Sequence, residues 1–256
     1  MRHIELMGLP GAGKTTIGSM FRARAGGCCP VCFSIQQGLL KYMKMVGQDG
    51  LLKLLLRVLP SRVAARRIVA LYRMSKDSWR NQCCFVATHG AALRAVIDGK
   101  QFHLMSIRER SRSISRFLDT ACAYQALVEL KDDTIVFDEG FIQCGVSCFL
   151  APNRGEVFDA GSMVMYLEAM PEADLVIDVD TPLSVCVDRL EHRGRTLRLA
   201  GSSEEDLIVF LRNSEKYLNE VRRILDHRGV RVIRVDNAGH ADSTAAAIHS
   251  IIEDYL

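Results

Sequence analysis

The chain has 256 residues, of which 48% are hydrophobic and 25% are charged, so its composition excludes an intrinsically disordered protein. The formal net charge is only +3, which gives no reason to expect a nucleic-acid partner. No uncharged apolar run of about 18 residues occurs, so we expect no membrane-spanning helix. Because the chain starts directly with a strand and a functional loop, we expect no signal peptide and a cytoplasmic location.

The first half of the chain predicts two strands followed by a long helical block. From residue 39 to residue 130 the pattern is mostly helical, and Cys83–Ile97 is the one segment there that could begin as a strand. In chain order, the predicted elements are a strand over Arg2–Met7, a glycine-rich turn over Gly8–Thr15, a helix over Thr15–Ala25, a strand over Val31–Ile35, and helices over Leu51–Leu59, Arg62–Trp79, Cys83–Ile97 and Ser106–Glu129.

In the second half, strands and helices alternate. The predicted elements are a strand over Thr134–Phe137, a helix over Glu156–Met170, a strand over Asp174–Val179, helices over Thr181–Arg193 and Ser203–Leu225, a strand over Val230–Val235, and a helix over Ser243–Tyr255. Strands separated by helices indicate parallel βαβ units. We therefore expect one α/β domain with a five-stranded parallel sheet, its core formed by residues 1–38 and 131–256, with 39–130 as a helical insertion.

The segment GLPGAGKT, Gly8 to Thr15, matches the pattern G-x-x-x-x-G-K-[ST] in full and lies between a predicted strand and a predicted helix. Glycines let successive backbone N–H groups face one anion, and the start of the following helix adds its positive end. The nucleotide-binding residues that this loop predicts are Gly8, Leu9, Pro10, Gly11, Ala12, Gly13, Lys14, Thr15 and Thr16.

Three side chains of this loop have separate predicted tasks. Lys14 is expected to reach the β- and γ-phosphates, Thr15 to bind Mg²⁺ through its hydroxyl, and Thr16 to reach the α-phosphate. We expect ATP and not GTP, because the chain has no Asn-Lys-x-Asp segment of the kind that recognises guanine.

An acidic pair, Asp138 and Glu139, ends the strand over Thr134–Phe137. Because ligands bind at the carboxyl ends of parallel strands, Asp138 should face the phosphate loop. There it could hold Mg²⁺, directly or through water, or accept the proton of an acceptor hydroxyl. For Glu139 two roles stay open: to activate water in a hydrolase, or to face the acceptor pocket of a kinase, where it could simply form a salt bridge. Gln143 is a candidate substrate contact one turn later.

An arginine-rich segment follows the strand over Asp174–Val179. Arg189 and Arg193 are spaced i and i+4 and so share one helix face, and Gly194 permits a bend that brings Arg195 and Arg198 inward. Guanidinium groups on a closing segment stabilise a transferring phosphoryl group and help to exclude water. A solvated basic loop is the alternative.

Four of these stretches, GLPGAGKTT, VFDEG, LVIDVDTPLSVCVDRLEHRGR and VIRVDN, resemble the nucleoside and nucleotide kinase branch of P-loop proteins. Thymidylate kinase and the deoxynucleoside kinases are nearest in layout, over about residues 1–35 and 134–256. The resemblance implies the three-layer P-loop NTPase fold, Mg·ATP bound by Gly8 to Thr16, and a lid that carries Arg189, Arg193 and Arg195. It also implies that the loop containing Asp236 lies near the adenine.

The sequence departs from this family in two places. The family carries Asp-Arg or Glu-Arg after the third strand, where the arginine holds the acceptor, whereas this chain has Asp138-Glu139. The second strand ends in Ser34-Ile-Gln-Gln, without the carboxylate that serves as the base in deoxynucleoside kinases. These departures leave the acceptor unidentified.

The helical block is basic: Lys41 to Arg80 contains ten Lys or Arg residues and two Asp. It could line an acceptor pocket, lie on an anionic membrane surface, or form a helical cover with solvated charges. We favour the last interpretation, and the four arginines from Arg108 to Arg116 fall under the same choice.

Nine cysteines occur, and we expect reduced, partly buried thiols. Cys29 and Cys32 have the spacing of a zinc or redox pair, a less favoured alternative because no second pair at matching spacing follows.

The leading hypothesis is an ATP-dependent kinase whose partners are Mg·ATP and a small-molecule acceptor, and a homodimer is compatible with it. Asp138 is the first choice for the general base. The rival is an ATPase or nucleotide-dependent switch that acts on a protein partner, with Glu139 activating water.

Overall fold

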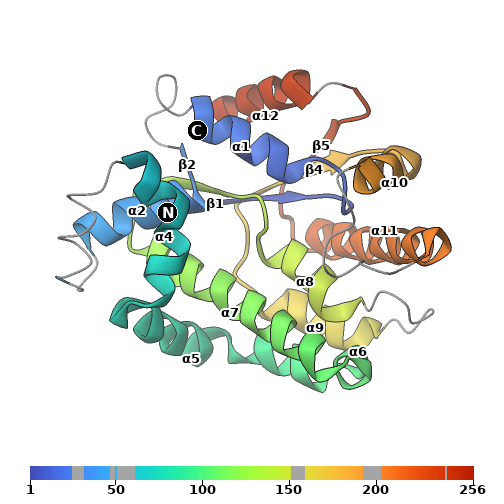
Figure 1. Cartoon of the computed structure of the whole chain (residues 1–256), viewed down its shortest axis with the longest axis horizontal. Coiled ribbons are helices and arrows are strands. Elements are labelled where there is room, and N and C mark those ends of the chain that lie inside the picture. Colours follow the sequence, from blue (N-terminus) through green and yellow to red (C-terminus); the bar gives the residue numbers. More distant parts are fainter. Residues whose placement is uncertain (25–31, 47–49, 51–60, 151–158, 193–202, 240) are drawn as a thin grey trace.

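The computed structural model describes every residue except 25–31, 47–49, 51–60, 151–158, 193–202 and 240. At its centre is a sheet of order β2-β3-β1-β4-β5 in which all neighbouring strands are parallel (Figure 1). The strands are β1 (Arg2–Met7), β2 (Cys32–Ser34), β3 (Thr134–Phe137), β4 (Leu175–Asp180) and β5 (Val232–Asp236). The prediction of an α/β fold with a parallel sheet is confirmed.

Helices cover both faces of this sheet (Figure 1). On one face lie α1 (Lys14–Arg24) and α12 (Ala241–Tyr255), which pack against each other. On the other face lie α7 (Ile107–Val128), α8 (Phe141–Phe149), α9 (Ala160–Ala169) and α11 (Glu204–His227). The remaining helices are α2 (Ile35–Met45), α4 (Ser61–Arg73), α5 (Lys76–Asp98), α6 (Lys100–Leu104) and α10 (Leu183–His192). Within the described residues, none of the helices combines the length and the apolar character that crossing a membrane requires.

The helices between residues 39 and 130 share a hydrophobic core with the sheet. Leu39 and Tyr42 of α2 and Tyr72 of α4 pack with Ile135 and Phe137 of β3 in one buried cluster. The larger cluster joins the other side chains of β1, β3 and β4 to those of α5, α7, α8 and α11. Burial of apolar surface stabilises a fold by roughly 25 cal/mol per Å². Here it holds α2 and α4 against β3, next to the outermost strand β2.

Side-chain caps set several helix boundaries. Ser34 and Gln37 form a capping box that starts α2 directly after β2, so the predicted strand over Val31–Ile35 ends at Ser34. Ser75 accepts a hydrogen bond from the Ser78 N–H and starts α5. The prediction of one helix over Arg62–Trp79 was therefore wrong: α4 ends at Arg73 and a separate helix follows.

Two further differences concern the second half of the chain. The helix predicted over Glu156–Met170 begins at Ala160, where Asp159 caps it, and residues 151–158 lie outside the described part. Helix α8 was not predicted at all. It has only nine residues, all of them buried, and its polar pair, Gln143 and Ser147, is too short a pattern to indicate a helix by spacing alone. The predicted helix over Leu51–Leu59 lies outside the described residues.

Candidate active site

The phosphate loop connects β1 to α1, and its glycines are required by its surroundings. Gly11 and Gly13 have φ angles of 89° and 90°, which disfavour any other residue. A Cβ atom at Gly11 would lie 2.7 Å from the Cys186 carbonyl oxygen, and one at Gly13 would lie 2.7 Å from Asn237 Nδ2. The loop is thus packed tightly against α10 and the segment after β5.

Lys14 is buried inside this loop. Its Nζ donates hydrogen bonds to the carbonyl oxygens of Gly8, at 2.7 Å, and Leu9, at 2.8 Å. Burial lowers the pKa of Lys14 to about 8, and the nearby Glu139 carboxylate partly opposes this shift. The ammonium group is therefore held by neutral carbonyls, at the place where the phosphates of a nucleotide would offer it stronger partners.

Asp138 lies beside the phosphate loop because β3 is the neighbour of β1 in the sheet. Its carboxylate packs on α1, where a Cβ atom at Gly18 would lie 3.1 Å from Asp138 Oδ2. Gly18 is one turn beyond Thr15, so the Asp138 carboxylate and the Thr15 hydroxyl belong to the same end of α1. Both residues line one cavity.

This pair fits a magnesium ion. Mg²⁺ prefers hard oxygen ligands and usually takes one or two from the protein and the rest from phosphates and water. Among the described residues, no three His, Cys, Asp or Glu side chains gather into a complete metal site. When Mg²⁺ binds together with ATP, the protein needs to supply only one or two of its oxygen ligands. The Thr15 hydroxyl and the Asp138 carboxylate, next to a phosphate loop, match that number.

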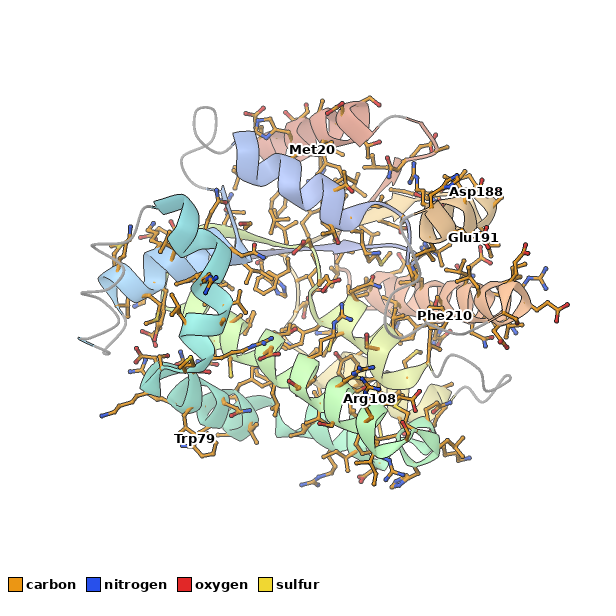
Figure 2. All side chains as sticks on the ribbon, viewed as in Figure 1. Met20, Trp79, Arg108, Asp188, Glu191 and Phe210 are labelled. Carbon is orange, nitrogen blue, oxygen red and sulfur yellow. The ribbon has the colours of Figure 1, made fainter. Side chains whose placement is uncertain are left out.

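Two cavities meet at this place. The first has a volume of about 140 Å³ and is lined by the phosphate loop, Gln143 of α8 and Phe210 of α11, which is labelled in Figure 2. The second has a volume of about 320 Å³ and lies among α2, α4, α7 and the end of β3. Three residues line both cavities: Thr15, Arg116 and Glu139.

Arg116 and Glu139 form an ion pair at this junction. Arg116 Nη2 lies 2.7 Å from Glu139 Oε2, and Arg116 Nη1 donates to Ser147 Oγ at 3.1 Å. The residue after Asp138 is thus a carboxylate that holds an arginine from α7. The salt-bridge alternative for Glu139 is what the structure contains, whereas the water-activating role stays a prediction that nothing here tests.

The larger cavity has an apolar wall and a second ion pair. Ile35, Leu39 and Val69 line it on one side, and Arg73 forms an ion pair with Asp119 on the other. The Tyr72 hydroxyl is fixed between two groups: it donates to the Cys122 carbonyl oxygen and accepts from Asn81 Nδ2. Part of the basic block, including Arg73, therefore lines a cavity.

The turn that carries Asp138 and Glu139 is anchored by Glu5 of β1. The Glu5 carboxylate is 1% exposed and accepts the N–H groups of Phe141 and Ile142, both at 2.9 Å, at the N-terminus of α8. A Cβ atom at Gly140 would lie 2.3 Å from Glu5 Cδ, so only glycine fits there. A negative charge at a helix N-terminus is favourable, and here it also fixes the turn after β3.

The first turn of α8 is also anchored through its carbonyl groups. The hydroxyl of Tyr166 donates to the Phe141 carbonyl oxygen, and the hydroxyl of Tyr217 donates to the Ile142 carbonyl oxygen. Burial raises the pKa of both tyrosines, so they remain neutral donors. Gln143 thus projects into the smaller cavity from a helix that is fixed on several sides.

Arg189 reaches the segment after β5. Its Nη2 donates to the carbonyl oxygen of Asn237 at 3.0 Å, and its Nη1 has no hydrogen-bond partner among the described residues, although it is buried close to Gly13. The predicted roles of Arg193 and Arg195, like the inward bend to Arg198, lie outside the described residues.

Asp236 and Asn237, in the loop after β5, differ in exposure and in hydrogen-bond partners. The Asp236 carboxylate accepts the N–H of Ala238 and is exposed, whereas Asn237 is buried and donates from Nδ2 to the Ala12 carbonyl oxygen at 2.6 Å. The side chain of this segment that contacts the phosphate loop is therefore that of Asn237, which the sequence analysis did not select. The nucleotide role of Asp236 stays a prediction.

The prediction of reduced, partly buried thiols can be compared with the structure for six of the nine cysteines. The six cysteines from Cys83 onward are free thiols. Cys29 and the side chain of Cys32 lie outside the described residues, so the zinc or redox alternative for this pair stays untested.

No protein-family model and no curated protein sequence matches this chain. Among solved structures, deoxyadenosine kinase from M. mycoides with dCMP and dCDP bound is 13% identical, with a TM-score of 0.47. The same enzyme with dCTP is 12% identical, with a TM-score of 0.45, and with dATP it is 14% identical, with a TM-score of 0.47. Each match covers 99% of this chain and 100% of the other. At these identities and TM-scores the likeness assigns neither a family nor an activity to this chain.

Proposed function

We propose that this protein is an ATP-dependent phosphotransferase that moves the γ-phosphate of ATP to a hydroxyl group of a small, uncharged acceptor. The observation that supports this most directly is the meeting of two cavities at Thr15, Arg116 and Glu139. One cavity is bounded by a phosphate loop, and the other, larger one opens onto the same point beside Asp138. A phosphoryl group held by the loop can therefore face a second molecule.

The donor side uses the phosphate loop. The backbone N–H groups from Gly8 to Thr16 and the positive end of α1 bind the phosphates, and Lys14 leaves its carbonyl partners for the β- and γ-phosphates. Thr15 and, directly or through water, Asp138 would hold Mg²⁺, which neutralises charge on the phosphates when it is bound. Asn237 stabilises the loop through its hydrogen bond to the Ala12 carbonyl oxygen, and Arg189 in turn holds Asn237. The segment with Asp236 contacts the adenine.

On the acceptor side, Asp138 is the general base. The acceptor oxygen forms a bond to the γ-phosphorus, the bond between that phosphorus and the β–γ bridging oxygen breaks, and ADP leaves. The proton of the acceptor hydroxyl passes to the Asp138 carboxylate. Arg193 and Arg195 complete the site from the closing segment and exclude water, a role that rests on their spacing in the sequence.

The charges around the larger cavity favour an uncharged acceptor. Its described lining contains two cationic side chains, Arg73 and Arg116, and each is paired with a carboxylate, Asp119 or Glu139. An acceptor that already carried a phosphate would have to displace Asp119 from Arg73, the pair that lines the larger cavity alone, whereas a neutral molecule binds without breaking it. Apolar side chains such as Leu39 and Val69 offer the rest of its surface a partner.

The rival function, hydrolysis of ATP by an ATPase or switch, has less support. Hydrolysis has no use for a second cavity of about 320 Å³ behind the phosphate loop.

Release of ADP tests the proposal. The purified protein is incubated with Mg·ATP alone and then with nucleosides, sugars and aminoglycosides, with nucleotides as the charged comparison. We expect turnover that depends on an uncharged acceptor, a nucleoside or a sugar; the aminoglycosides, which are cations at neutral pH, belong with the nucleotides as charged comparisons. Strong hydrolysis without any acceptor, lost in Glu139→Gln, would establish the rival function instead. Acceptor-dependent turnover with nucleotides only would contradict the uncharged acceptor while leaving the phosphotransferase in place.

A further inference from the structure

The four arginines near the start of α7 differ in what their side chains reach. Arg108, Arg112 and Arg116 are spaced by four residues and so lie along one face of the helix. Arg108, labelled in Figure 2, and Arg112 are exposed. Of these three, only Arg116 lines a described cavity, and it lines both. One arginine of a uniform-looking stripe therefore reaches the place where donor and acceptor meet.

The Arg116 guanidinium is oriented by two partners. Glu139 accepts from one terminal nitrogen and Ser147 from the other, and Ser147 itself belongs to the firmly held helix α8. The Arg116 side chain remains 39% exposed and that of Glu139 52% exposed, so the pair borders open space and is not sealed in the core. An ion pair with this exposure is weak enough to exchange partners when a more highly charged group arrives.

Electrostatics place this pair within range of the phosphate-binding lysine. The pKa of Lys14 is lowered chiefly by burial; Glu139 raises it and Arg116 lowers it further. Both charged groups therefore act on the point where the β- and γ-phosphates bind. Without a cation beside it, Glu139 would repel an incoming triphosphate.

We propose that Arg116 is a catalytic residue that leaves Glu139 to contact the equatorial oxygens of the transferring phosphoryl group. This inference rests on the phosphotransferase function proposed above. A planar guanidinium matches two phosphoryl oxygens at once and stabilises the charge that spreads over them during transfer. Until that group arrives, Glu139 and Ser147 keep the Arg116 guanidinium at the junction of the two cavities.

The test uses a mimic of the transferring phosphoryl group and needs no acceptor. Calorimetry measures the affinity of the full chain for Mg·ADP alone and for Mg·ADP with aluminium fluoride. For the wild type we expect tighter binding with the fluoroaluminate. For Arg116→Ala we expect this preference to fall at least tenfold while the affinity for Mg·ADP alone stays within about twofold, because removing one such donor typically costs a factor of about 10² to 10³ in rate.

Three variants separate the contribution of the Arg116 guanidinium from those of its position on the helix, its charge and its ion pair with Glu139. Arg112→Ala removes an exposed arginine one turn away and should keep the wild-type preference. Arg116→Lys keeps the charge but loses the planar fork, so it should recover only part of the preference. Glu139→Gln breaks the same ion pair without removing the guanidinium, so it should keep more of the preference than Arg116→Ala.

The outcomes distinguish the two proposals. If the wild type binds no Mg·ADP, the phosphotransferase proposal fails. If the wild type prefers the fluoroaluminate complex and Arg116→Ala does so equally, only the role of Arg116 is refuted. Equal losses in Glu139→Gln and Arg116→Ala would mean that the ion pair acts structurally, and they too would overturn the inference. A wild type without any preference for the fluoroaluminate would do the same.

Discussion

The two sides of the cleft are built in different ways. On the donor side, the phosphate loop is one continuous stretch, and the only side-chain cation of that loop, Lys14, contacts the backbone of the loop itself, while Asn237 is the distant residue that supports it. On the acceptor side, the contacts join segments far apart in the chain: Arg73 pairs with Asp119, and Arg116 pairs with Glu139. Backbone geometry therefore decides the first region, and side-chain packing between helices decides the second.

This difference implies that the two regions can be altered separately. A change in the phosphate loop should affect the binding of every nucleotide, whatever the acceptor. A change in the helical wall of the larger cavity should affect the acceptor and leave ADP binding intact. Four measurements test or refine this separation, beginning with the largest expected effect.

Lys14→Ala should lower turnover by about 10³-fold, because the only side-chain cation of the phosphate loop is lost. Turnover is followed by ADP release, and the melting temperature shows whether the variant is folded. Lys76→Ala, an exposed lysine at the start of α5, is the control and should behave like the wild type. Normal turnover in Lys14→Ala would refute the donor site altogether.

Glu5→Gln tests the anchor that links the donor strand β1 to the turn with Asp138. A carboxamide can accept only one of the two N–H groups of α8 that the carboxylate accepts, so the free energy of unfolding should fall by about 1.5 to 3 kcal/mol. Chemical denaturation measures this loss. Affinity for Mg·ADP should change little, because the phosphate loop keeps its own contacts. A fall in ADP affinity larger than the fall in turnover would contradict the separation of the two sides.

The pKa of Lys14 predicts how nucleotide affinity depends on pH. With a pKa of about 8 in the free protein, Lys14 loses its proton as the pH rises through 8, whereas bound phosphates keep it charged. The bound state thus holds more protons, and affinity should fall by roughly five- to tenfold between pH 7.5 and pH 9. Calorimetry in buffers of different ionisation enthalpy should detect proton uptake. The same dependence in Lys14→Ala would assign it to another group.

The smallest effect is expected at the Arg73–Asp119 pair. Because the Arg73 side chain is 54% exposed, a double-mutant cycle with alanine should give a coupling of only about 0.2 to 1 kcal/mol in unfolding. The same variants should raise the KM of the acceptor and leave Mg·ADP affinity unchanged. Weaker ADP binding in either variant would show that the two cavities are not independent.

The same contrast explains what the sequence could predict. The phosphate loop and the position of Asp138 follow from a local motif and from the rule that ligands bind at the carboxyl ends of parallel strands. Arg116 could not be selected, because it is one of four similar arginines and only the packing of α7 decides which one reaches the cavity. Asn237 escaped notice because its contact with Ala12 joins opposite ends of the chain.

Buried polar residues were the other omission. Glu5 lies in a strand whose other buried side chains are apolar apart from His3, which lies 3.1 Å from the Glu5 carboxylate. Nothing local shows that this carboxylate also accepts from a helix that begins at Phe141. That helix was itself missed, because its nine residues are too few to show a clear helical period. Only the order of strands in the sheet brings these two features together.

The contact between Glu5 and Gly140 restricts the order in which the sequence can change. A methyl group at position 140 would overlap the Glu5 carboxylate, whereas a shorter residue at position 5 would leave room for it. A larger residue at position 140 therefore displaces the Glu5 carboxylate from the N–H groups of Phe141 and Ile142, unless Glu5 has been shortened first. In a combinatorial library, substitutions at 140 should accordingly be recovered more often together with a change at 5 than alone.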